Sequence, residues 1–339
     1  MIYRLNENNQ ITKFSDTLLE YACCKYLPDN SLIIPVGPNR THDEFEILIN
    51  DHPNISYLLF ENFGNPIDTV TQLRYLEQLA LSKPFYILSG LFTYYKNPTP
   101  DPRIKFFPFW VMWTSDPHSV FANFAKHKFS NLPKKYKVSC LNGTPWNHRK
   151  LVYLHLAHTD YFNDIIYSFK HRPNTVDNIN DLVLTNAEID GLMHLPSTVN
   201  FIDNDEIVGI DVTINHSAYL ETYINLVTET NIRASTPMLS EKSFKPIVAG
   251  QLFILVAAQG AVQFMRDIGL DTFDDIIDHT YDTITDNRLR IQAALAQVDY
   301  LMTLDLDQLY IKIQPRLLRN SEYFRSIEFR NQFLVNFSY

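Results

Sequence analysis

Glycine and cysteine are scarce in this chain of 339 residues, which holds 9 Gly and 3 Cys. Neither GxGxxG nor GxxxxGK[ST] occurs, so the glycine-rich loops that cradle phosphates in many nucleotide-binding proteins are excluded. The cysteines, Cys23, Cys24 and Cys140, are odd in number and form no CxxC pair. A disulfide framework and a cysteine zinc site are therefore not indicated, and the composition fits a reducing cytoplasm.

Long apolar runs and an excess of positive charge are also missing. No stretch reaches the roughly 20 apolar residues that a membrane helix needs. The first ten residues, MIYRLNENNQ, lack the apolar core that a signal peptide has. The net charge is −9 and the sequence pI is about 5.6. Long-range attraction to nucleic acid is therefore not expected, and we expect a cytoplasmic protein without a membrane span.

The remaining composition is that of a globular protein, and the length suits two domains. Short apolar runs in the first 115 residues are typical of buried parallel strands. A helix is predicted over 69–82 from its spaced leucines. The predicted strands are 31–37, 55–61, 85–90 and 104–113.

A second alternation of strands and helices begins at 136. Residues 136–142 are predicted as a strand, 146–158 as a helix and 161–169 as a further helical segment. The stretch 171–212 has no assignable pattern. A strand–helix–strand unit follows over 225–260, then a short helix stopped by Gly269 and a helix over 287–301. The periodicity therefore predicts the α/β class.

The chemically unusual feature is the charged pair inside the 225–260 unit. Ser240 is predicted as the N-cap of a helix, which places Glu241 and Lys242 in the first turn, where an anion could dock. Phe244 and Ile247 would face a sheet that includes 252–258. On spacing alone, a solvated Glu-Lys pair at a helix start is the favoured interpretation.

The same unit resembles the donor-binding signature of the α1,3-fucosyltransferase family. INLVTET, a short loop, LSEK, a helix and an apolar strand follow one another as they do in that family. The order continues upstream: YKVSCLNGTPWNHRK at 136–150 is similar to the first strand of the family's donor domain, with an Arg at the helix start. Phe60-Glu61-Asn62 with Pro66, and DPRIKFFPFWVMW at 101–113, resemble elements of its acceptor domain. The Glu-Lys-x-x-Lys-Pro variant seen here also resembles that of divergent phage, viral or bacterial proteins.

The resemblance implies a fold of two Rossmann-like, doubly wound domains that face one another across a cleft, the arrangement called GT-B. The expected division is an acceptor-side domain over 1–130 and a nucleotide-sugar-binding domain over 134–305. The segment 306–339 is expected to return to the first domain. Unlike many members of the family, this chain is not expected to be anchored by a stalk.

The resemblance also implies roles for individual residues. Arg149 and Lys242 would contact the pyrophosphate of the donor, a bidentate fork and a point charge respectively. Glu241 would accept hydrogen bonds from ribose, and Glu229 would lie beside the donor sugar or ribose. His148 is an alternative phosphate donor to Arg149. The chain departs from the family at Met238 and in the Lys245-Pro246 pair, which is expected to break the helix.

Transfer to an acceptor hydroxyl requires a base, and Glu61 is the candidate because it ends the apolar run 55–61. Asp101 and Glu44 are substitutes. The DNDE cluster at 203–206 lies in a polar segment without flanking strand signals, so metal ligation there is not favoured and no metal is expected to be required.

The leading hypothesis is an inverting, metal-independent glycosyltransferase that uses a nucleoside-diphosphate sugar, with GDP weakly preferred, and a glycan or other hydroxyl acceptor. Two alternatives stay open. One is transfer to hydroxylated bases of DNA, which the acidic net charge disfavours. The other is a catalytically inactive nucleotide-binding or interaction module.

Overall fold

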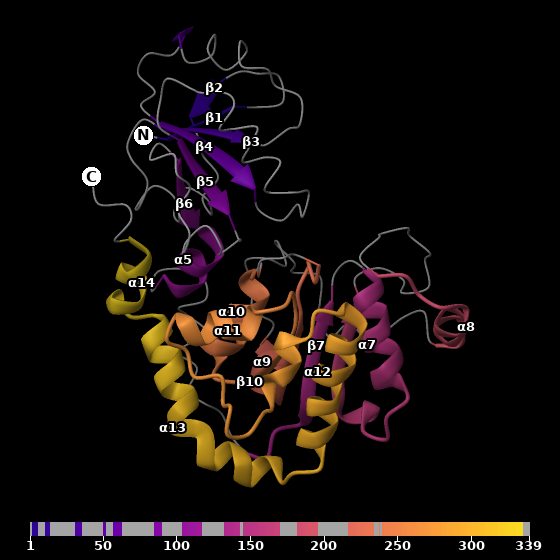
Figure 1. Ribbon diagram of the computed structural model, residues 1–339. Helices are drawn as coiled ribbons and strands as arrows, with labels where there is room; N and C mark the ends of the chain where they lie inside the picture. Colours follow the sequence, from indigo (N-terminus) through magenta and orange to yellow (C-terminus); the bar gives the residue numbers. More distant parts are fainter. Residues whose placement is uncertain are drawn as a thin grey trace. The chain divides into compact units, whose positions relative to one another are not determined.

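The structure is a computed structural model, and the chain folds into two compact units, Met1–Trp113 with Asn331–Tyr339 and Thr114–Arg330 (Figure 1). The predicted domain boundaries stay a prediction, although 306–324 belongs to the second unit here. The residues that the structure describes are 2–5, 11–13, 31–35, 50–51, 57–62, 85–89, 104–116, 132–142, 145–169, 182–195, 216–233, 237 and 239–334.

The first unit contains a six-stranded sheet in the order β2-β1-β3-β4-β5-β6. Only the β1–β2 pair is antiparallel, and the remaining pairs are parallel. The strands predicted at 31–37, 55–61 and 85–90 are confirmed as β3, β4 and β5. The bounds are β1 Ile2–Leu5, β2 Ile11–Lys13, β3 Ser31–Pro35, β4 Tyr57–Asn62, β5 Phe85–Ser89 and β6 Ile104–Pro108.

The strand predicted over 104–113 is wrong in its second half. β6 ends at Pro108, and Phe109–Ser115 forms helix α5. Pro108 has no N–H to continue a ladder, and its fixed φ suits the entrance to a helix. An uninterrupted apolar run carries no period that separates a buried strand from a buried helix, and Val111 and Met112 are both fully buried.

The second unit contains a four-stranded, wholly parallel sheet in the order β10-β9-β7-β8. The predicted strands at 136–142 and within the 225–260 unit are confirmed. Every residue of β9 and β10 is buried, as expected for parallel strands covered on both faces. The bounds are β7 Tyr136–Asn142, β8 Ile165–Phe169, β9 Thr222–Thr228 and β10 Leu252–Val256.

Helices cover both faces of this sheet (Figure 1). α7 (Asn147–Ala157) and α12 (Asn287–Met302) contact each other, and α12 packs on β10. α9 (His216–Leu220) and α10 (Glu241–Ala249) contact each other and β9, and α13 (Leu306–Phe324) packs on α10. The remaining elements are η1 Phe162–Asp164, α8 Asn186–His194, α11 Ala261–Asp267, η2 His279–Thr283 and α14 Ile327–Leu334.

Two helix expectations in this unit are wrong. The segment 161–169 forms the short η1 and then β8, because Ile165-Ile166-Tyr167 is a β-branched and aromatic run that pairs with β7. Pro246 does not break α10, which runs through it to Ala249. The lost hydrogen bond to the carbonyl of Lys242 is offset by burial of Phe244 and Ile247 against the sheet and α13.

Helix ends follow their predicted signals more closely. Ser240 is the N-cap of α10, and its hydroxyl accepts a hydrogen bond from the Lys242 N–H. Gly269 ends the short helix α11 with φ of 87°, and a Cβ there would lie 2.7 Å from the Tyr323 hydroxyl. Helix α8 lies inside the stretch that the sequence left unassigned.

The α/β class is thus confirmed, and the second sheet is compatible with a Rossmann-like fold. The GT-B arrangement stays a prediction. In the described ranges, none of the helices combines the length and apolar character that a bilayer crossing demands. The predicted helix at 69–82 and the DNDE cluster lie outside the described residues.

Candidate functional site at the carboxyl edge of the second sheet

The order of the second sheet contains a topological switch point. From β7 the chain crosses to β8 on one side, whereas β9 and β10 lie on the other side of β7. Right-handed crossovers therefore place α7 and α10 on opposite faces of the sheet. The carboxyl ends of β7 and β9 border a crevice between these crossovers, and open α/β sheets bind ligands at such a point.

Residues after β7 and β9 meet at this crevice. The Arg149 guanidinium, on the first turn of α7, donates to the carbonyl oxygen of Thr228 at 3.0 Å. The adjacent His148 Nε2 lies 2.8 Å from the carbonyl oxygen of Glu229 and donates to it, because a carbonyl only accepts. The Thr228 hydroxyl also donates to the Asn142 side chain at the end of β7. The start of α7 is thereby fastened to the end of β9.

The Glu229 carboxylate organises the start of α10. It is fully buried and accepts hydrogen bonds from the Ser240 N–H at 2.8 Å and the Ser240 hydroxyl at 2.8 Å. The Ser243 hydroxyl and the Thr230 N–H donate to the same carboxylate. These donors hold the loop after β9 and the first turn of α10 together. In this geometry Glu229 acts on the protein's own backbone and hydroxyl groups.

Glu241 and Lys242 form an ion pair of unequal exposure. The Lys242 Nζ lies 2.7 Å from the Glu241 Oε1, and the lysine side chain is 24 % exposed whereas the glutamate is 1 % exposed. Burial alone would raise the pKa of Glu241, but the ammonium groups of Lys242 and Lys245 outweigh it and the pKa lies below its usual value. A ribose contact to Glu241 would require the groups that cover it to move, because this side chain is almost fully buried.

The charged groups of the cluster shift one another's pKa values. Burial lowers the pKa of Lys242, yet the carboxylates of Glu241 and Glu229 overcome this and raise it, so the lysine stays protonated. Burial lowers the pKa of Arg149, partly opposed by Glu229 and Glu241. The cluster thus has two cationic side chains, Arg149 and Lys242, and two acidic ones, Glu229 and Glu241. An anion that binds here would replace a carboxylate as the partner of the partly exposed Lys242.

The structure therefore brings five predicted residues into one cluster: His148, Arg149, Glu229, Glu241 and Lys242. Sequence reasoning missed that Glu229 bonds to Ser240 and Ser243, because these partners are 11 and 14 residues away in the chain and no local pattern marks the pairing. The predicted base Glu61 lies in β4 of the first unit, paired in register with Pro35 and Leu88. Asp101 and Glu44 lie outside the described residues.

The search for a metal site and for similar proteins adds nothing to this assignment. Within the described ranges, no group of three or more His, Cys, Asp or Glu side chains is placed to hold a metal ion. Comparisons of the chain with protein-family models, curated proteins and solved structures find no match.

Proposed function

We propose that this protein is a glycosyltransferase that moves a sugar from a nucleoside-diphosphate sugar to an acceptor hydroxyl. The observation that carries the proposal is a buried cluster of charged side chains at the switch point of a parallel sheet. Such crevices are where open α/β sheets bind ligands, and charged groups with shifted pKa values gather at functional sites more often than elsewhere.

The chemistry of the proposed reaction fits the residues of the cluster. Departure of the sugar leaves negative charge on a diphosphate, and cationic groups fixed in a water-poor site stabilise that charge. Lys242 is the cation that reaches solvent, and it is kept protonated by the carboxylates around it. Arg149 adds a second positive charge under the crevice, held in place by the Thr228 carbonyl.

Nucleotide binding tests this assignment with a matched pair of lysines. Lys242 lies at the carboxyl edge, whereas Lys134 precedes β7 and donates to the Leu220 carbonyl at the opposite edge. We expect GDP, UDP or CDP to raise the melting temperature, since a ligand that binds only the native state stabilises it. Lys242→Ala should weaken nucleotide binding about 10-fold, the worth of a charge-assisted hydrogen bond. Lys134→Ala should leave the affinity unchanged.

Two calorimetric outcomes contradict the assignment. One is that none of the nucleotides or their sugars binds, and the other is that both lysine variants bind nucleotide as the wild type does. Nucleotide binding that depends on Lys242 without any sugar transfer would identify an inactive binding module in place of an enzyme.

The proposed base is tested separately through Glu61. If its carboxylate accepts the proton of the acceptor hydroxyl, Glu61→Gln should lower kcat by about 100-fold or more. Nucleotide affinity should be unchanged, because that loss concerns the transition state alone. A variant that keeps more than about a tenth of the wild-type turnover rules Glu61 out as the base.

A further inference from the structure

A pocket of the described chain lies on the helical flank of the second unit. It has a volume of about 740 Å³, within the usual range of small-molecule pockets. It opens between the end of α11, the segment before and within η2, and the last turns of α12. Its lining residues are Arg266, Asp274, Asp275, Ile276, Ile277, Asp278, His279, Thr280, Thr283, Gln297 and Tyr300.

The pocket shares none of its lining residues with the carboxyl-edge cluster. Arg290 of α12 donates to the carbonyl oxygens of Ala257 and Ile232, which follow β10 and β9, so the start of α12 lies at the carboxyl edge. Tyr300 is ten residues further along the helix, or roughly 15 Å at 1.5 Å per residue. The pocket therefore extends along α12 away from the proposed nucleotide site.

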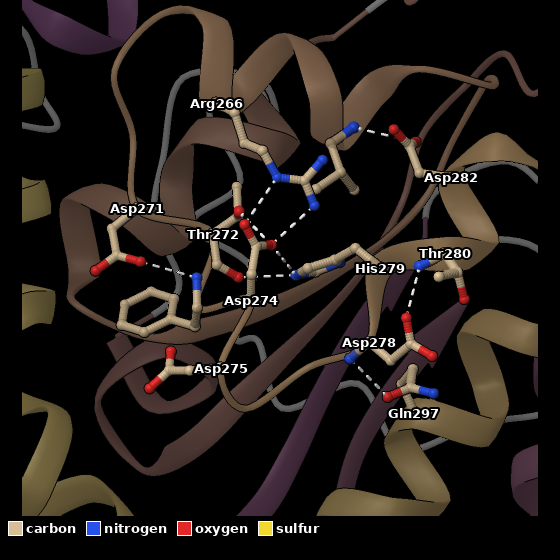
Figure 2. Close-up of polar contacts among 12 residues, drawn as sticks. Arg266, Asp271, Thr272, Asp274, Asp275, Asp278, His279, Thr280, Asp282 and Gln297 are labelled. Atoms are coloured by element: carbon tan, nitrogen blue, oxygen red, sulfur yellow. Dashed lines mark hydrogen bonds and ion pairs between the residues drawn. The ribbon is translucent and has the colours of Figure 1, made fainter.

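Two of the three carboxylates that line the pocket pair with an arginine. Arg266 donates two hydrogen bonds to the Asp274 carboxylate, at 2.9 and 2.8 Å (Figure 2). These bonds hold the pKa of Asp274 below its usual value. Asp275 lies 2.8 Å from Arg316. The excess of carboxylates disfavours an anionic ligand. Carboxylates that pair with an arginine still accept hydrogen bonds from the hydroxyls of a neutral ligand.

The histidine of the pocket also contributes no charge. His279 Nε2 donates to the Thr272 carbonyl at 2.7 Å, and the Tyr281 hydroxyl donates to Nδ1 at 3.0 Å. The Leu255 N–H in turn donates to that hydroxyl. This chain of hydrogen bonds fits the neutral imidazole. The floor of the pocket is therefore fixed in one arrangement.

The exposed groups around this floor are an aromatic ring and planar polar side chains. Tyr300 is 48 % exposed. The Gln297 side-chain oxygen accepts from the Asp278 N–H, which leaves its two amide hydrogens outside that bond (Figure 2). Asp278 uses Oδ1 to accept from the Thr280 N–H, so Oδ2 is outside that bond. An aromatic face with nearby amide, carboxylate and guanidinium groups can hold both the C–H face and the hydroxyls of a sugar ring.

We infer that this pocket binds a neutral saccharide, with one pyranose ring against Tyr300 and its hydroxyls hydrogen-bonded to Gln297, Asp278 and the Arg266–Asp274 pair. The inference is independent of the proposed transferase activity, because it concerns another part of the unit and is measured by binding alone. Loss of nucleotide binding in Lys242→Ala has no bearing on it.

The experiment titrates the full chain with maltohexaose, cellohexaose and chitohexaose, followed by calorimetry and by saturation transfer to the ligand in NMR. We expect at least one hexasaccharide to bind with a Kd of about 1 mM or lower. Tyr300→Ala should weaken that binding about 10-fold, whereas Tyr300→Phe, which keeps the ring, should bind nearly as the wild type does.

The matched control is Leu289→Ala, a change of a 56 % exposed residue on the same helix outside the pocket, and it should have no effect. Spermine and inorganic pyrophosphate serve as the cationic and anionic probes. The inference is overturned if no hexasaccharide binds at 20-fold the expected Kd or if Tyr300→Ala binds as well as Leu289→Ala. Spermine binding without saccharide binding also overturns it, because the pocket then selects cations.

Discussion

At the carboxyl edge of the second sheet the Lys242 Nζ lies 2.7 Å from a carboxylate oxygen of Glu241, whereas at the amino edge the Lys134 Nζ lies 2.7 Å from the carbonyl oxygen of Leu220. The pKa of Lys242 is raised because Glu241 and Glu229 outweigh the effect of burial. Burial lowers the pKa of Lys134 to about 8, with its ammonium group 4.8 Å from the centre of the Tyr310 ring.

The two lysines show that contact distance alone does not set the charge state of a buried amine. A carboxylate supplies a full opposite charge, whereas a carbonyl dipole and an aromatic ring supply only part of it. The carboxyl edge therefore keeps a cation at neutral pH, as the proposed nucleotide site requires. At the amino edge, a charged Lys134 destabilises the folded state, because burial disfavours the charge.

The largest effect on this comparison is expected from Glu229→Ala. The change leaves the Ser240 N–H and the Ser240 and Ser243 hydroxyls without their acceptor and removes a negative charge beside Arg149. We expect a loss of about 3–5 kcal/mol in the free energy of unfolding, as for one partner removed from a buried charged group. Urea denaturation measures it.

The control is Glu221→Ala, at the amino edge beside the start of β9, where the change should be within about 0.5 kcal/mol, as is usual for a side chain outside such a network. A loss below about 1 kcal/mol for Glu229→Ala, the worth of a single ordinary hydrogen bond, would mean that the carboxylate does not organise the start of α10.

A smaller effect is expected from Lys242→Met, which removes the ammonium group and keeps most of the apolar stem. Because the folded-state pKa of Glu241 is lowered, its carboxylate contributes stability above its unfolded pKa of about 4.5, and this is lost as the pH falls. Without Lys242 that contribution shrinks by about 1–2 kcal/mol, the worth of a hydrogen bond to a charged group.

The measurement is urea denaturation at pH values from 3 to 7. The wild type should lose more stability than Lys242→Met as the pH falls below about 5. Parallel stability curves for the two proteins would contradict the role given to this ion pair.

The smallest effect is expected at the amino edge. The folded-state pKa of Lys134 is about 8 against 10.5 in the unfolded chain, so between these values the unfolded state binds more protons. The wild type should gain stability as the pH rises from 8 to 10.5, by about 1 kcal/mol once partial solvent screening is taken into account. Lys134→Met should lack this gain.

Chemical denaturation at pH 8 and pH 10 measures the difference, and Lys137→Met is the control because Lys137 is 40 % exposed and pairs with Asp164 on the surface. An equal rise of stability in the wild type and in Lys134→Met would show that Lys134 is charged in the folded protein at pH 8 and well above it.

The two sheets also differ in what their topology offers. In the first unit the described parallel strands follow chain order, β1-β3-β4-β5-β6, whereas in the second the order β8-β7-β9-β10 reverses direction at β7. Only a reversal opens a crevice between crossovers on opposite faces. Among the described strands, the topological argument for a ligand site therefore applies to the second sheet alone.

Much of the local structure was predictable from the sequence. The strands β3, β4, β5, β7, β9 and β10 and the helices α7, α10 and α12 were all predicted from apolar runs, periodicity or caps. The failures have three different causes. Residues 109–115 form an apolar segment without a decisive period, and 165–169 is a short β-branched and aromatic run. Pro246 is tolerated because its neighbours are buried. Tertiary packing decided these cases.

The sequence by itself determined the α/β class, the N-cap Ser240 and the position of Glu241 and Lys242 at a helix start, because each depends on residues within a few positions of one another. Only the tertiary structure decided that Arg149 meets the end of β9, 79 residues away, and that Glu229 bonds to Ser240. It also decided that Tyr300 borders a pocket with Arg266. Contacts between distant segments depend on strand order and crossover handedness, which no local pattern encodes.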